Sequence, residues 1–268
     1  MYYYILEQPK NKTIESLQNK IISIIEDLQI MGEAVKANPV QKPADLCEIG
    51  LSKGYNTIIA IGSDSLINNI APLVAKKNAV LGIVPIDDNS SFFNLIQSVN
   101  WSEAIEALPK RITQVIDLGI VNKDQVFLTH VFIRPTKIKK PVLFKTIFNQ
   151  FEIEVPALEA MASNSYLDFK TGTWNRLGFT DGLVSVHFKT ETSQEPTGFW
   201  GKLFQKKDAA YSSLFHQDKI YLGGLEQSLQ VYSSDNQPIC HTPVTVSVLE
   251  KAIKIIVAKK SHSENSKS

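Results

Sequence analysis

The sequence predicts an α/β N-terminal lobe built on a parallel sheet, followed by an antiparallel, β-rich C-terminal lobe. Up to about residue 110, short apolar runs alternate with helical periods, which is typical of βαβ units. From residue 112 onward, nearly every apolar segment is a short strand. The chain has 268 residues, enough for two lobes of ordinary size.

The N-terminal lobe is expected to begin with a strand at residues 1–7. The next helix is predicted to start at a Thr13 cap, because apolar residues recur every three or four positions as far as Leu28, and to stop at Gly32. The remaining elements alternate between strand and helix, at 34–36 (strand), 43–53 (helix), 56–61 (strand), 66–75 (helix) and 79–85 (strand).

The C-terminal lobe is predicted to consist of strands at 115–121, 126–133, 142–147, 151–155, 183–188, 219–222, 244–249 and 252–257. We expect lobes at 1–112 and 113–258, the second resembling a β-sandwich, with the terminal strand free to return to the first lobe. Residues 259–268 are polar and of low complexity, so a disordered tail is expected.

Composition narrows the classes of function. The chain has 28 Lys and Arg against 27 Asp and Glu, so nucleic acid is not an expected partner. No window reaches the roughly 18 to 20 apolar residues of a membrane span. The first residues lack the basic and apolar regions of a signal peptide, which predicts a cytoplasmic protein. Cys47 and Cys240 lie far apart, without a CxxC motif, and are expected to be buried free thiols.

Polar loops follow the two buried strands that end at Ile61 and Pro85. Ligands of an open parallel sheet bind beyond the carboxyl ends of its strands. We therefore expect the loops at 62–65 and 86–91 to lie side by side, and to open toward Asp117 and Asp235.

One of these loops carries a family resemblance. Ala60-Ile-Gly-Ser-Asp-Ser-Leu-Ile-Asn-Asn69 resembles the GGDGT-x-N-E signature of bacterial diacylglycerol kinases and the related sphingoid lipid kinases. Four further segments follow in that family's order: Gly82-Ile-Val-Pro85, Val115-Ile-Asp-Leu-Gly119, Phe179-Thr-Asp-Gly-Leu183 and Ser234-Asp-Asn-Gln237. The last of them is followed by Thr242-Pro-Val-Thr-Val and a final strand, as in that family. Each segment is weakly specific alone, but together they extend over about 60–257.

The resemblance implies a transferase of phospholipid metabolism that uses ATP and Mg²⁺ to phosphorylate a lipid hydroxyl. It places the nucleotide against Gly62, Ser63, Asp64, Ser65, Asn68, Asp88 and Asn89. It also implies that Asp117 and Asp235 orient metal and base, with Gln237 at the position of the base. A structural Mg²⁺ would be held by Asp181 with the backbone carbonyls of Gly178 and Leu183.

Each of these residues also has a plain structural interpretation. Asp64 can serve its own loop without a ligand, and Asp88 or Ser90 can cap the following helix. The remaining aspartates fit a strand start or a turn: Asp117, Asp181 and Asp235.

The sequence departs from the family at three places. Ser63 and Ser65 stand at glycine positions, where each Cβ would cost roughly 1 to 2 kcal/mol in a left-handed geometry. Asp87 and Asp88 replace part of a Gly-Thr-Gly-Asn loop, and their charges oppose triphosphate unless a metal or lysine cancels them. Gln237 replaces a glutamate, and an amide cannot accept the proton of the acceptor hydroxyl.

One segment predicts contact with lipid. Phe199, Trp200 and Phe204 lie among lysines in 197–207, a combination that suits a bilayer interface. Packing of the same aromatic residues onto the β lobe is the alternative.

The sequence thus predicts a diacylglycerol-kinase-like lipid kinase with weak or lost phosphotransfer. The first alternative is a non-catalytic pseudokinase that binds a nucleotide, a lipid or a protein partner. The second is an NAD-kinase-like enzyme, because NAD kinases share the GGDG turn. The expected location is cytoplasmic, with peripheral contact at the inner membrane face as an option.

Overall fold

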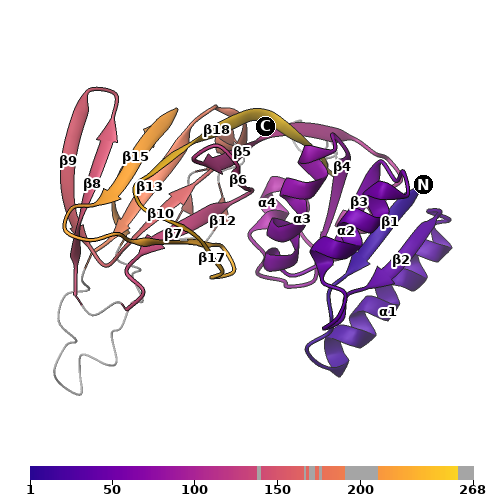
Figure 1. Ribbon diagram of the computed structural model, residues 1–268. Coiled ribbons are helices and arrows are strands. Elements are labelled where there is room, and N and C mark those ends of the chain that lie inside the picture. Colours follow the sequence, from indigo (N-terminus) through magenta and orange to yellow (C-terminus); the bar gives the residue numbers. More distant parts are fainter. Residues whose placement is uncertain (138–139, 166, 169–172, 175–176, 191–210, 259–268) are drawn as a thin grey trace, which may run out of the picture. The chain divides into compact units, whose positions relative to one another are not determined.

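The computed structural model describes the chain except for residues 138–139, 166, 169–172, 175–176, 191–210 and 259–268 (Figure 1). The chain forms two compact units. The first unit contains Met1–Ile116 together with the chain from Lys251 onward, and the second contains Asp117–Glu250.

The first unit is a doubly wound α/β layer structure, visible in Figure 1 as strands flanked by helices. Its parallel strands lie in the order β2-β1-β3-β4. The strands are β1 (Tyr2–Leu6), β2 (Gly32–Lys36), β3 (Thr57–Gly62) and β4 (Val80–Pro85). The helices are α1 (Lys12–Asp27), α2 (Pro43–Ser52), α3 (Asp64–Lys76), α4 (Phe92–Leu95) and α5 (Trp101–Ala107). The predicted α/β lobe with a parallel sheet is confirmed.

Hydrophobic patterning explains these elements. Every residue of β3 is buried, as expected for a strand covered on both faces. The helix α1 buries Ile21 and Ile25 and exposes its polar side. The predicted Thr13 cap is wrong by two positions: the Asn11 carboxamide accepts the backbone N–H of Ile14 (2.9 Å), and the helix begins at Lys12.

The second unit is built from antiparallel strands. Its six-stranded sheet has the order β14-β13-β10-β7-β16-β17, and β15, β8 and β9 belong to another sheet. The elements are β6 (Gln125–Phe127), β7 (His130–Arg134), β8 (Val142–Phe148), β9 (Phe151–Ala157), β10 (Glu159–Ser163), β11 (Leu167–Asp168), β12 (Thr173–Trp174), the short 3₁₀ helix Leu177–Thr180, β13 (Val184–Lys189), β14 (Tyr211–Gln217), β15 (Lys219–Gly224), β16 (Gln230–Ser233) and β17 (Pro238–His241). One apolar core joins the two sheets and includes Phe144, Val186 and Val231. The predicted antiparallel β-rich architecture is confirmed.

Two strands belong to both units, namely β5 (Thr113–Val121) and β18 (Val244–Ile256). The first residues of β18 pair antiparallel with β15, and its last residues pair in parallel with β4. The sequence predicts two strands here, but the structure has one, with Lys251 at a φ of 52° inside it.

The single strand predicted at 126–133 is instead two strands, β6 and β7. The break at Leu128 and Thr129 has a topological reason, because β6 pairs with β5 while β7 pairs with β10 and β16 in the other sheet. A buried apolar run does not by itself show where a chain changes sheets.

Candidate functional site

The loops after β1, β3 and β4 meet at the carboxyl edge of the sheet in the first unit. The strand order reverses between β1 and β3, and this point is where open α/β sheets bind ligands. The Glu7 backbone N–H donates to the Ile61 carbonyl (3.0 Å), and the Ile86 N–H donates to the Gly62 carbonyl (3.1 Å). The loops at 62–65 and 86–91 therefore begin next to each other.

Glu7 fills the first of these loops with a carboxylate. Its Oε2 accepts the backbone N–H of Ser63 (2.8 Å), and its Oε1 accepts the Ser63 hydroxyl (2.8 Å). Ser63 is the N-cap of α3, and backbone N–H groups at a helix N-terminus are ready-made anion partners. Gly62 permits the approach, since a Cβ there would lie 2.8 Å from the Cβ of Glu7.

Asp64 joins the two loops to each other. Its Oδ2 accepts the backbone N–H of Ser91 (3.2 Å) and the Ser91 hydroxyl (2.7 Å), while its Oδ1 accepts the Ser90 hydroxyl. Ser90 in turn accepts the N–H of Phe92, the first residue of α4 (3.2 Å). The predicted neighbourhood of the two loops is confirmed, and Asp64 is one of the residues that create it.

The strain expected at the two serines of this loop is absent. Ser63 has a φ of −75° and a ψ of 168°, and Ser65 lies in the first turn of α3. The left-handed conformation that would penalise a Cβ is therefore not adopted at either position. The helix starts at Asp64 without needing glycines.

The other predicted nucleotide residues make local hydrogen bonds. The Asn68 carboxamide donates to the Asp64 carbonyl one helical turn earlier (2.9 Å). The Asn89 N–H donates to Oδ1 of Asp87 (3.0 Å), which closes a turn in the exposed part of the second loop. Asp88 is exposed in the same turn.

We predict that Asp64→Ala lowers the free energy of unfolding by about 2 kcal/mol, because three donors from the second loop lose a charged acceptor. Asp88→Ala is the matched control and should change it by less than about 0.5 kcal/mol, since the residue is exposed. Urea unfolding followed by circular dichroism measures both. Equal stabilities of the two variants would contradict the role given to Asp64.

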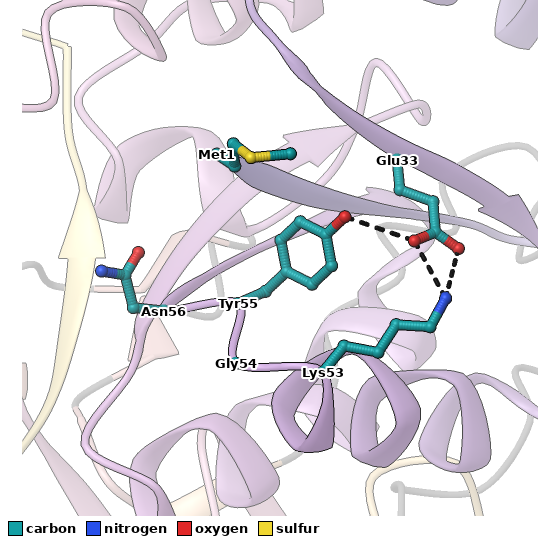
Figure 2. Close-up of a pocket in the computed structure, with 6 residues that line it drawn as sticks. All are labelled: Met1, Glu33, Lys53, Gly54, Tyr55 and Asn56. Carbon is teal, nitrogen blue, oxygen red and sulfur yellow. Dashed lines mark hydrogen bonds and ion pairs between the residues drawn. The ribbon is translucent and has the colours of Figure 1, made fainter.

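Cavities open on the described part of the first unit, and two of them have charged linings. The larger, about 690 Å³, lies beside Glu7 and is also lined by Lys10, Asn38 and Lys42 from the loops after β1 and β2. The other, about 530 Å³, is drawn in Figure 2. There the charged groups pair with each other: Lys53 contacts Glu33 at 2.7 and 2.9 Å, and the Tyr55 hydroxyl donates to Glu33 (3.3 Å).

The turn with the predicted metal ligand lies in the second unit. Asp181 accepts the N–H of Leu183 on Oδ1 (2.9 Å), and its Oδ2 lies 3.1 Å from Nε2 of His216. Nδ1 of the same imidazole lies 2.9 Å from the hydroxyl of Ser185. Buried Asp117 joins this turn by accepting the N–H of Gly182 on Oδ2 (3.1 Å). The structure thus brings Asp117 and Asp181 to one turn.

Gly178 belongs to the short 3₁₀ helix of that turn and packs closely on Ser165, whose Oγ would lie 2.5 Å from an added Cβ. Asn164, which precedes Ser165, is fully buried and donates to the Asp117 carbonyl (2.7 Å) and the Leu128 carbonyl (3.2 Å). The backbones of β5 and of the segment between β6 and β7 are therefore held by the side chain that directly follows β10.

The predicted base position lies in the hairpin turn between β16 and β17. Gln237 is exposed, and its N–H donates to the Ser233 hydroxyl (3.1 Å). Asp235 accepts a short hydrogen bond from the Ser233 hydroxyl. Asn236 has a φ of 62°, and its carboxamide accepts from Arg134 (2.8 Å), which also pairs with buried Glu159 (2.6 Å).

Buried histidines in the second unit predict a pH-dependent stability. Burial lowers the pKa of His187 to about 4, with a smaller electrostatic contribution from neighbouring His216, and burial alone lowers the pKa of His130 to about 4. The unfolded chain, with a histidine pKa of about 6.5, binds more protons between these values. Stability is therefore expected to fall as the pH drops from about 6.5 to about 4, by at most about 3 kcal/mol per histidine.

The test compares unfolding free energies of wild type, His187→Gln and the exposed control His241→Gln across that pH range. His187→Gln should remove about half of the pH dependence, and His241→Gln should leave it unchanged. A wild-type stability that is flat between these pH values would contradict the assignment.

Three residues of these sites were missed by the sequence analysis. Glu7 was assigned to the first strand, although an acidic residue at the carboxyl end of β1 is a usable signal once a switch point is expected. His216 and Arg134 reach their partners from 35 and 25 residues away, and no local spacing reveals such pairs.

Two of the earlier expectations concern membranes. The predicted lipid-contact residues Phe199, Trp200 and Phe204 lie outside the described residues. Within the described part of the chain, no helix has both the length and the hydrophobicity needed to cross a bilayer.

Comparison with known proteins gives a match only at the level of structure. No family model matches the sequence, and no curated protein matches it. A diacylglycerol kinase from Bacillus anthracis str. Sterne has a TM-score of 0.70 at 18% identity, covering 96% of this chain and 96% of that chain.

Two nicotinamide dinucleotide kinases are also similar. An NAD kinase from Archaeoglobus fulgidus in complex with ATP has a TM-score of 0.62 at 10% identity, with 97% and 95% of the two chains covered. Yeast NADH kinase complexed with NADH has a TM-score of 0.56 at 8% identity, with 98% and 84% covered. The chain therefore has the fold shared by these kinases, as the sequence predicted.

Proposed function

We propose that this chain is a diacylglycerol-kinase-like protein that has lost efficient phosphotransfer because its own carboxylates close the loops that would hold a nucleotide. The observation that carries the proposal is the pair of hydrogen bonds from Ser63 to Glu7. Phosphate groups bind at the same kind of donor, a backbone N–H at the start of a helix. ATP would have to displace Glu7 before its phosphates could reach this donor.

Electrostatics make that displacement unfavourable. A phosphate oxygen brought to about 4 Å from the Glu7 carboxylate would be repelled by roughly 1 kcal/mol in water and about 4 kcal/mol at an effective dielectric constant of 20. A triphosphate carries several charges, so the repulsion acts more than once. The lysines of the adjacent cavity, Lys10 and Lys42, are exposed, and solvent weakens their compensation.

The second loop supports the same conclusion. Both carboxylate oxygens of Asp64 accept hydrogen bonds from Ser90 and Ser91. If Asp64 bound a metal-bound phosphate, the contacts that hold the second loop would break. Asp87 and Asp88 add further negative charge in the exposed part of this loop. Mg²⁺ and ATP are therefore not required ligands in this proposal.

The base position is the third support. Gln237 cannot take a proton from a lipid hydroxyl, and the neighbouring Asp235 is engaged by Ser233. Loss of a general base typically lowers a rate by about 10²- to 10⁴-fold. Phosphotransfer requires that the triphosphate is bound and that a base removes the proton of the acceptor hydroxyl. Both requirements are impaired here, so the two losses in rate combine.

The function that remains is binding without turnover. We favour a lipid over a nicotinamide dinucleotide as the ligand class, because the diacylglycerol kinase is structurally more similar (TM-score 0.70) than the NAD kinase (0.62). An NAD-kinase-like activity would need the same loops, 62–65 and 86–91, to hold the phosphates of ATP. Their closure by Glu7 and Asp64 therefore argues against that activity as much as against lipid phosphorylation.

A phosphotransfer assay tests the proposal. Purified protein, radiolabelled ATP, MgCl₂ and diacylglycerol in mixed vesicles should give no labelled lipid above a protein-free blank, and replacing the lipid by NAD should give no labelled dinucleotide. An active diacylglycerol kinase serves as the positive control. Robust transfer to either acceptor would overturn the proposal and would assign the proton transfer to Asp235 or another group.

A further inference from the structure

The turn at Gly178–Leu183 departs from the metal site that the family resemblance implies. That resemblance gives Asp181 a structural Mg²⁺, held together with backbone carbonyls. Mg²⁺ prefers near-ideal octahedral coordination by oxygen. The question is whether the Asp181 carboxylate still has an oxygen to offer.

Both oxygens of Asp181 already accept hydrogen bonds. Oδ1 accepts the N–H of Leu183 at 2.9 Å, which closes a local turn, and Oδ2 faces Nε2 of His216 at 3.1 Å. A cation approaching Oδ2 would meet the imidazole N–H. The donor set does not fit Mg²⁺.

The imidazole of His216 makes a continuous chain of hydrogen bonds. Ionised Asp181 is acceptor-only, so Nε2 must carry the proton of that hydrogen bond, while Nδ1 of the same ring pairs with the hydroxyl of Ser185 at 2.9 Å. Ser185 is fully buried in β13, and His216 is part of β14. One side chain thereby ties the turn to two neighbouring strands.

The same turn also holds Asp117. The Gly182 N–H donates to its carboxylate at 3.1 Å, and Gly182 has a φ of 72°, which favours glycine. The position of the turn therefore decides where a buried aspartate of β5 finds its hydrogen-bond donor. Whatever holds Asp181 in place also orders Asp117.

We propose that His216, in place of a divalent cation, fastens the Gly178–Leu183 turn onto β13 and β14, so that this turn is independent of Mg²⁺. The bridge consists of two hydrogen bonds, to Asp181 and to Ser185. His216 is a positioning residue in this account and touches no substrate.

Thermal unfolding without nucleotide tests the proposal. Exchanging a chelator for millimolar MgCl₂ should change the melting temperature of wild-type protein no more than that of Asp181→Asn. His216→Ala should melt lower by about 4 °C or more, because Asp181 and Ser185 both lose a partner. The control His241→Ala removes an exposed histidine from the same unit and should melt like wild type.

The ring nitrogen of His216 that carries the proton gives a second readout. A side chain that only filled space in the core would not fix which nitrogen is protonated. Long-range ¹H–¹⁵N correlation spectra should show a proton on Nε2 of His216, and Ser185→Ala should shift the Nδ1 resonance. This measurement on the wild-type protein decides the matter even if the alanine variants fail to fold.

Two results would overturn the proposal: a Mg²⁺-dependent rise in melting temperature that Asp181→Asn abolishes, or a His216 ring protonated on Nδ1 alone. A Mg²⁺ response that persists unchanged in Asp181→Asn would support it, because that response comes from another part of the protein. Neither arm depends on ATP binding, so failure here is distinguishable from failure of the proposed loss of phosphotransfer.

Discussion

Gln237→Glu alone is expected to leave lipid phosphorylation undetectable. The substitution supplies a carboxylate at the base position, and a general base is typically worth about 10²- to 10⁴-fold in rate. That gain requires a triphosphate already bound and aligned with the acceptor hydroxyl. Glu7 occupies the Ser63 donors in this variant as it does in the wild type, so the new base has no reaction to assist.

Activity should appear only when the loops are opened as well. The combination of Glu7→Ala, Asp87→Gly and Asp88→Thr with Gln237→Glu removes the internal carboxylate and the extra charges of the loops and supplies the missing base. Labelled lipid should then rise above the blank. The same loop substitutions with Gln237 retained form the control, and they should yield about 10²-fold less product or none. Strong activity of the single Gln237→Glu variant would show that the loops are open to ATP.

The second large effect is expected on ATP affinity. Glu7→Ala should bind ATP about 10- to 1,000-fold more tightly than the wild type, because one like charge at about 4 Å and one internal hydrogen-bond acceptor are both removed. Glu7→Gln should lie between the two, since the amide still fills the loop but carries no charge. Isothermal titration calorimetry gives all three affinities.

The control for this series is Glu15→Ala. Glu15 is an exposed glutamate in the first turn of α1, and its carboxylate pairs with Lys36 at 3.3 Å. The Glu15→Ala variant changes the net charge by the same amount as Glu7→Ala and should leave the ATP affinity unchanged within about twofold. If Glu15→Ala raised the affinity as much as Glu7→Ala, the effect would reflect overall charge and not the occupancy of the loop.

The fold could be predicted from the sequence because its signals are local. Continuous apolar runs such as 57–62, separated by amphipathic helices, identify parallel strands without any knowledge of their partners. The position of the 62–65 and 86–91 loops then followed from the rule that parallel strands end at one edge. The wrong predictions concern local detail. The cap of α1 is Asn11 and not Thr13, the chain breaks between β6 and β7, and β18 is one continuous strand.

The candidate site was only half predictable, for a different physical reason. Motif comparison identifies the loops but not what fills them, because Glu7 reaches Ser63 across 56 residues and His216 reaches Asp181 across 35. The motif comparison also predicted backbone strain at Ser63 and Ser65, and this prediction is wrong. The loop adopts ordinary backbone angles, so a serine fits at both of these glycine positions. Side-chain pairs between distant elements require the assembled sheet.

The proposal that Glu7 and Asp64 close the loops at 62–65 and 86–91 to nucleotide is tested most directly by titrating wild-type protein with ATP, with and without Mg²⁺, in a calorimeter. The account predicts millimolar or undetectable binding in both conditions. Micromolar binding of ATP would contradict it, because a nucleotide that binds so tightly must have access to the donors that the Glu7 carboxylate occupies in this structure.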